Sequence, residues 1–195
     1  MISSPVLAAV AQTARTFSRK TRDARPLACV SSARDLADGG NAAPLIAAYP
    51  HATDREAHQA RLDFERDLRF RWDMWAWARL QAKTGHSAVY YYSFTQQPPG
   101  WGASHFAELW YVFDHLDQAP WKPSQSDHHL ATTMSDYWVN FVRTGNPNGT
   151  GLPQWRPLVG DTGPVQYLGQ TVASGSLSDL GQLKVFDEVY SSLRH

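Results

Sequence analysis

Residues 87–94 read SAVYYYSF, and this stretch decides the fold. From Val89 to Phe94 it is an unbroken run of mostly aromatic residues without glycine or proline. Such a run is typical of a strand that is buried on both faces, as in the parallel sheets of α/β proteins. The Pro/Gly-rich segment TQQPPGWGAS follows at 95–104 and predicts a loop. Loops that leave the end of a buried strand are where open α/β sheets place functional groups.

His105 follows this loop at the start of the stretch HFAELWYVF and is the first candidate for chemistry. Gly102, Ala103 and Ser104 before it allow a sharp bend and leave room beside the ring. An imidazole can accept a proton and return it near neutral pH. The residues alone leave a second interpretation open, which is a hydrogen-bonded structural histidine at the entry of a helix.

Helical patterns dominate the chain upstream of the strand. NAAPLIAAYP at 41–50 predicts a short helix that ends before Pro50. Thr53 and Glu56 have the spacing of a capping box, so a helix is expected from there to Gly85. Its length allows either one helix or two helices broken near 67–70. By contrast, residues 1–40 carry no sustained helix or strand period, and we expect no regular element there.

Two further helices are expected downstream of the strand. The segment 126–149 predicts a helix that is capped by Ser126 or Asp127 and ends at Gly145. A last helix is expected at 180–193, with Gly181 weakening its first turn.

Composition excludes several classes of partner. Eighteen basic residues balance eighteen acidic residues, so nothing favours nucleic acid or an anionic membrane as a partner. The apolar stretch at 6–10 is too short to span a bilayer and has no basic residues before it. We therefore expect no membrane span and a cytoplasmic location, with secretion left open if a further N-terminal segment exists. The lone Cys29 cannot form an internal disulfide and has no histidine nearby.

Metal and cofactor chemistry is not expected. The spacing of His105 and Glu108 suggests a ligand pair, but no second histidine falls at zinc-site spacing on that face. His128 and His129 are adjacent and would point about 100° apart on a helix, which makes joint ligation of one ion difficult. We expect no metal site and no cofactor.

A nucleophilic serine is also missing at the usual spacing. The Gly-x-Ser-x-Gly elbow of α/β-hydrolases does not occur, and the nearest candidate, ASGSLSDLG at 173–181, has glycines and serines at other spacings. It also follows His105, whereas those enzymes run serine, acid, histidine along the chain.

Several segments together resemble a known family. VYYYSFTQQPP, GASHFAELWYVF, Trp121, the run YWVNFVRTGNPNG at 137–149, QWRPL and YLG at 167–169 are similar to the C-terminal part of the type B carboxylesterases. This family includes para-nitrobenzyl esterases, lipases of the same type and cholinesterases. GNAAPLIAAYP resembles the family segment that ends in Tyr-Pro. The resemblance covers residues 38–195, whereas residues 1–37 form an N-terminal segment that resembles nothing in the family.

The resemblance implies a fold class and a role for His105. The expected fold is α/β, a C-terminal fragment of an α/β-hydrolase fold that is helix-rich with one or two core strands. His105 takes the position of the catalytic histidine, which accepts the serine proton and then protonates the departing alcohol. Glu108 matches a family carboxylate that we treat as structural.

The departures from the family shape the functional expectation. The oxyanion loop, the serine elbow and the acid motif lie upstream in the family, and none of them is present here. We therefore expect part of a carboxylic ester hydrolase that carries the catalytic His105, is inactive alone and needs a missing N-terminal half to act on a small carboxylic ester. The alternative is a non-catalytic, cholinesterase-like interaction module or a degenerate remnant.

Overall fold

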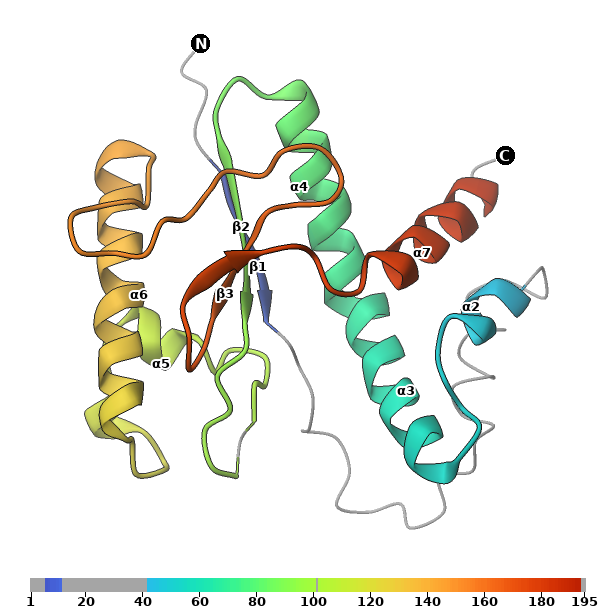
Figure 1. Cartoon of the computed structure of the whole chain (residues 1–195), viewed down its shortest axis with the longest axis horizontal. Helices are drawn as coiled ribbons and strands as arrows, with labels where there is room; N and C mark the ends of the chain where they lie inside the picture. Colours follow the sequence, from blue (N-terminus) through green and yellow to red (C-terminus); the bar gives the residue numbers. More distant parts are fainter. Residues whose placement is uncertain (1–5, 12–41, 101, 194–195) are drawn as a thin grey trace. The chain divides into compact units, whose positions relative to one another are not determined.

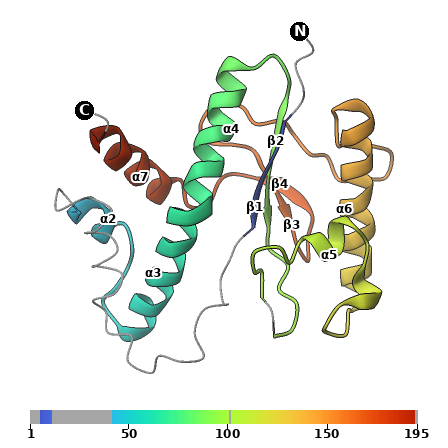
Figure 2. The ribbon, with the colours of Figure 1, turned by 180° about the vertical axis from the view of Figure 1, so that it is seen from behind.

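The structure is a computed structural model that describes residues 6–11, 42–100 and 102–193. The chain divides into two units, which are described separately: Met1–Thr16 with Trp77–Leu177, and Phe17–Ala76 with Ser178–His195. Figures 1 and 2 show the elements from two opposite sides.

The first unit is built on a four-stranded sheet in the order β1-β2-β3-β4. Its strands are β1 (Val6–Ala11), β2 (Val89–Phe94), β3 (Val165–Leu168) and β4 (Ala173–Gly175). β2 is parallel to both β1 and β3, and β4 runs antiparallel to β3. All six residues of β2 are buried, which confirms the predicted strand and the α/β class.

The sheet contains more strands than the one or two that were expected. The prediction of no regular element in residues 1–40 is wrong for β1, because VLAAVA lacks the alternation and the large side chains that mark a strand. Its conformation depends on pairing with β2, in the register Val6 opposite Val89 to Ala11 opposite Phe94. The sequence signal for β3 is weak, because this strand is short and contains Gln166, a polar residue that is fully buried. The Cys29 region lies outside the described residues.

α6 (Gln125–Thr144) confirms the long helix of this unit, although its cap differs from the prediction. The cap is Ser124, whose side chain accepts a hydrogen bond from the backbone N–H of Asp127, while the carboxylate of Asp127 accepts from the backbone N–H of Ser124. Asp127 is therefore the third helical residue of a capping box rather than the cap. Gly145 ends the helix in the left-handed conformation, as expected.

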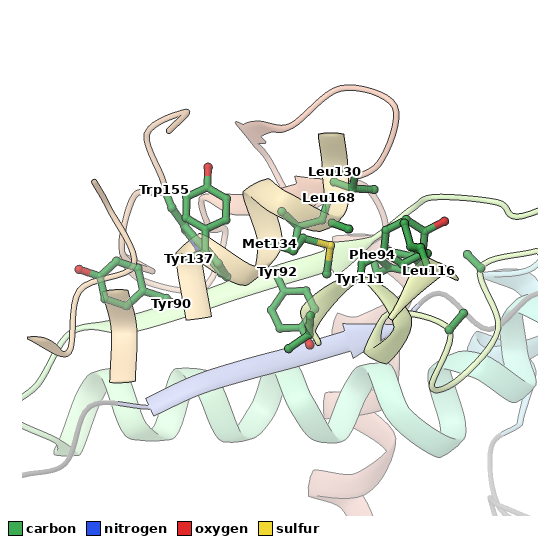
Figure 3. Close-up of a cluster of buried hydrophobic side chains, with 14 of the residues drawn as sticks. Tyr90, Tyr92, Phe94, Tyr111, Leu116, Leu130, Met134, Tyr137, Trp155 and Leu168 are labelled. Carbon is green, nitrogen blue, oxygen red and sulfur yellow. The ribbon is translucent and has the colours of Figure 1, made fainter. Parts of the chain in front are cut away.

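The core of this unit is aromatic and lies between β2 and α6 (Figure 3). Trp155 is fully buried, with its ring edge-on to the rings of Tyr90, Tyr92 and Tyr137 at 5.2–6.1 Å between centroids. Asn148 fixes the segment that carries this tryptophan, since its amide exchanges two hydrogen bonds with the backbone of Trp155, at 2.7 and 2.9 Å. The GNPN turn thus locks a large part of the core.

The second unit is helical. It contains α2 (Ala43–Ala47), α3 (Asp54–Arg66), a π-helical turn η1 (Asp67–Arg71) and α7 (Leu180–Leu193), and α4 (Trp72–Thr84) begins in it. The short helix, the Thr53–Glu56 capping box and the last helix are confirmed. The sequence left open whether this region forms one helix or two. The structure shows that α3 continues into α4 through the π-helical turn, so the helical conformation is not interrupted.

A buried charge network surrounds this turn. Arg66 bonds to Asp63, Asp67 and Asp179 at 2.9, 2.8 and 3.2 Å, and Arg71 also pairs with Asp179. Buried ions are tolerated only when they are paired in this way.

No helix within residues 6–11, 42–100 and 102–193 has the length and apolar character needed to cross a membrane.

Candidate functional site

The loop after β2 leaves the middle of the parallel part of the sheet. Thr95 donates its backbone N–H to the carbonyl of Leu168 at 2.7 Å, so the chain turns away directly beyond the end of β3. Gly100 and Gly102 have φ angles of 78° and 62°, which glycine adopts without a steric cost. The sequence prediction of a loop at the end of a buried strand is confirmed.

His105 lies on a tight turn that precedes α5 (Leu109–Val112). The backbone N–H of Ala107 donates to the carbonyl of Ser104 at 3.0 Å, and the N–H of Leu109 donates to the carbonyl of Phe106 at 3.1 Å. His105 itself is exposed, whereas Ser104 and Ala107 on either side are buried. The turn is thus anchored by the buried residues on either side of His105, while His105 remains exposed.

Phe106 adds an unusual feature beside the histidine. Its φ of 71° lies in the left-handed region, which is uncommon for a bulky residue. Its side chain is 61% exposed, and its ring centroid is 3.9 Å from that of His105. The imidazole therefore has an apolar aromatic surface directly against it.

Glu108 is buried behind the same turn, and its side chain is 7% exposed. Burial raises the pKa of this carboxyl, against the opposing effects of hydrogen bonds from the backbone N–H groups of Glu108 and Phe106 and of the charge of His105. Its Oε2 has no hydrogen-bond partner among the described residues. The burial of Glu108 agrees with a structural role, which remains a prediction.

The strands that flank β2 end without carboxylates. The carboxyl ends of parallel strands lie at one edge of a sheet, so a segment that follows a strand next to β2 could supply an acid to a histidine after β2. β3 is followed in sequence by Gly169-Gln170-Thr171-Val172, and β1 by Gln12-Thr13-Ala14-Arg15. Neither stretch contains aspartate or glutamate.

The three histidines that were weighed as metal ligands beside His105 lie on the surface. His128 and His129 are exposed on α6, and His115 is exposed after α5. In the described ranges, no three His, Cys, Asp or Glu side chains gather closely enough to hold a metal ion. The serine-rich stretch at 173–181 forms β4 and the segment before α7.

Sequence reasoning missed the residues that tie the histidine segment to α6. Asp127 was assigned only to a helix cap, yet it also accepts hydrogen bonds from Gln96 and Tyr111. The spacing of Ser124 and Asp127 is a signal for the capping box, but nothing local reveals the two distant donors.

The carboxylesterase family model matches residues 16–179. The match therefore begins before residue 38, the position at which the resemblance of the sequence motifs begins. The cocaine esterase of Homo sapiens is 40% identical over 76 residues, which cover 34% of this chain and 14% of that protein. The pyrethroid hydrolase Ces2e of Rattus norvegicus is 38% identical over 92 residues, covering 43% of this chain and 16% of that protein.

Solved structures of PNB esterases share the fold. One has a TM-score of 0.68 at 20% identity, and the alignment covers 87% of this chain and 34% of the esterase. A thermophilic PNB esterase has a TM-score of 0.66 at the same identity. The chain thus spans about a third of the length of these structures and a smaller share of the curated relatives.

Proposed function

Because the chain belongs to the carboxylesterase family, we propose that it is the histidine-bearing part of a carboxylic ester hydrolase. In this proposal His105 is the general base, and the nucleophilic serine and the acid belong to another part of the domain. The chain alone then does not turn over an ester. The position of His105 on an exposed turn after the central parallel strand is the observation that supports this function.

The chemistry asks two things of His105. It takes the proton of the serine as the hydroxyl attacks the ester carbonyl, and it returns that proton to the departing alcohol. Both transfers need an imidazole that a second part of the protein and a substrate can reach, which the exposure of His105 allows. The adjoining Phe106 ring favours an apolar group of the ester beside the imidazole.

The apolar surface around the histidine supports the need for a further part of the domain. Phe106, Leu109 and Phe113 are 61%, 41% and 61% exposed within one short segment. Clustered exposed apolar side chains mark surfaces that another protein segment or a ligand covers. The missing N-terminal half of an α/β-hydrolase domain is the occupant we propose.

A second candidate is a non-catalytic remnant or interaction module. The absence of carboxylates directly after both strands that flank β2 favours it, because a triad needs an acid that orients the imidazole. The two candidates differ in whether activity returns when the missing parts are supplied.

Complementation separates them. The chain is assayed on p-nitrophenyl acetate alone and after co-expression with the N-terminal portion of a PNB esterase that carries a serine elbow and an acid. We expect no hydrolysis by the chain alone and hydrolysis by the pair, which His105→Ala abolishes and His128→Gln, on the exposed side of α6, leaves intact.

Each outcome decides between the candidates. Hydrolysis by the isolated chain that depends on His105 would contradict the need for a second part. A folded but inactive pair would favour the remnant, and an active His105→Ala pair would remove the histidine from the mechanism. A Gly-x-Ser-x-Gly elbow encoded in the DNA upstream would independently support the esterase.

A further inference from the structure

Asp127 uses its two carboxylate oxygens for different purposes. Oδ2 accepts hydrogen bonds from the backbone N–H and the hydroxyl of Ser124, at 2.8 and 2.6 Å, and so completes the cap of α6. Oδ1 accepts from Nε2 of Gln96 at 2.8 Å and from the hydroxyl of Tyr111 at 2.7 Å. Only the Oδ1 bonds reach outside the helix start.

Gln96 and Tyr111 bracket the histidine along the chain. Gln96 is the second residue after β2, and Tyr111 is in α5, so His105 lies on the segment between them. Both side chains are buried, at 7% and 0% exposure. The two ends of the histidine segment are thereby joined at one oxygen atom of α6.

The side chains of Gln96 and Tyr111 direct their polar groups to Asp127. Oε1 of Gln96 has no partner among the described residues, so the Nε2 bond to Asp127 is the hydrogen bond given for its side chain. The Tyr111 ring packs against Phe94 at 5.2 Å between centroids, which fixes the ring, and Asp127 receives its hydroxyl (Figure 3 shows these two rings).

The carboxylate is charged at neutral pH. Burial acts to raise its pKa, but the hydrogen bonds from Ser124, Tyr111 and Gln96 outweigh burial and hold the pKa of Asp127 below its ordinary value. Hydrogen bonds to an ionised acceptor are about twice as strong as neutral ones, so these bonds can order a loop.

We propose that Asp127 is a positioning residue for His105, which fixes the imidazole relative to the sheet by joining both ends of its segment to the first turn of α6. Asp127 does not reach the reacting atoms in this proposal. The catalytic meaning of the position rests on the proposed function, whereas the positioning itself can be measured without any ester.

The test uses the histidine side-chain signals of the full chain, labelled with ¹³C at Cε1 and assigned with His105→Gln. Asp127→Ala removes both carboxylate oxygens and with them both Oδ1 bonds. We expect the His105 signal to shift and broaden, because its segment samples more than one position. Tyr111→Phe, which removes one of the two Oδ1 bonds, should move the signal in the same direction by less.

Ser124→Ala is the matched control. It removes the hydroxyl bond to Oδ2 and weakens the helix cap, but leaves both Oδ1 bonds in place. The signals of the neighbouring His128 and His129 should then move while the His105 signal stays. A stability effect that merely spreads from α6 would move His105 in Ser124→Ala as well, and that result would overturn the proposal.

An unchanged His105 signal in folded Asp127→Ala would also overturn it. If Asp127→Ala does not fold, Tyr111→Phe and Gln96→Ala replace it, since each removes one bond to Oδ1 and keeps the capping box, and an unchanged His105 signal in both would overturn the proposal. These experiments measure histidine signals and not ester hydrolysis. If the proposed function fails, they therefore still show whether Asp127 positions His105.

Discussion

The phenolic hydroxyl of Tyr49 donates a 2.8 Å hydrogen bond to Oδ2 of Asp67, which lies 18 residues further along the chain. Tyr49 is 3% exposed and Asp67 is fully buried. This bond joins the segment after α2 to the π-helical turn between α3 and α4. Nε of Arg66 donates to the other oxygen of Asp67 at 2.8 Å, so the carboxylate has a partner on each side.

Tyr49→Phe should destabilise the second unit. The ring and its contacts remain, but a buried carboxylate loses a donor, which typically costs about 1–3 kcal/mol. Urea unfolding followed by far-UV circular dichroism measures the loss. Tyr190→Phe is the control, since that ring stacks on Trp72 and no hydrogen bond of its hydroxyl is part of the network. Equal effects of the two substitutions would contradict a special role of the Tyr49 hydroxyl.

Gly169→Ala should destabilise the start of the histidine loop. A Cβ at this position would lie 2.3 Å from Oγ1 of Thr95 and 3.3 Å from the backbone N of Gln96. Overpacking of this kind costs about 1–3 kcal/mol. Removal of the closest atom by Thr95→Ala should recover part of the loss, and a double-mutant cycle on the urea midpoint measures this coupling.

Gly181→Ala should raise the stability of the chain, in contrast to Gly169→Ala. A Cβ built there has no atom within 4 Å apart from its chain neighbours and the backbone of its own helix, and the residue is helical in α7. Alanine should therefore stabilise by up to about 1 kcal/mol. Destabilisation by Gly181→Ala, or additivity of Thr95→Ala and Gly169→Ala, would contradict the steric account.

Glu108 should make the stability of the chain depend on pH. Burial raises its folded-state pKa above the ordinary 4.5, so the folded chain binds more protons than the unfolded chain just above that pH. Stability contributed by this group is therefore lost as the pH rises from 4.5 through the raised pKa. Glu108→Gln does not titrate at this position. The urea midpoint of the variant minus that of the wild type should therefore increase as the pH rises from 4 to 7.

The control for this pH dependence is Glu188→Gln, an exposed position on α7. Its midpoint should follow the wild type across the same range. Parallel curves for the wild type and Glu108→Gln would show that the buried carboxyl does not titrate differently in the two states.

The apolar side chains beside His105 should cause self-association of the isolated chain. Phe106, Leu109 and Phe113 are large, exposed and close in sequence. The double substitution Leu109→Ser with Phe113→Ser should lower concentration-dependent association in sedimentation velocity. Val142→Ser, at an 82% exposed position on α6, should change it little. The same decrease in both variants would exclude this surface as the cause.

Elements with strong local signals could be predicted from the sequence. β2 has six consecutive buried residues, Thr53 and Glu56 form their capping box, and Gly145 ends α6 in the left-handed conformation. In each case short-range sterics or hydrogen bonding decides the structure, and a few neighbouring letters carry the information.

The remaining elements depend on distant partners. β1 is a run of small apolar residues that becomes a strand by pairing with β2, and β3 hides the buried Gln166 in a short run. The sequence indicates His105 as a candidate site, because it follows a buried strand. The sequence does not indicate the bonds from Gln96 and Tyr111 to Asp127, because hydrogen bonds between distant segments leave no periodic pattern.

The pairing of β1 with β2 also bears on biosynthesis. The two strands lie roughly eighty residues apart, and at about 5–20 residues per second the ribosome needs on the order of 4–16 s to make the second after the first. During that time VLAAVA has left the ribosome, or is leaving it, without its neighbour. The helices between the strands can form locally, while closure of the parallel pair waits and is intrinsically slow. The emerging chain therefore offers chaperones an early apolar target long before His105 has been translated.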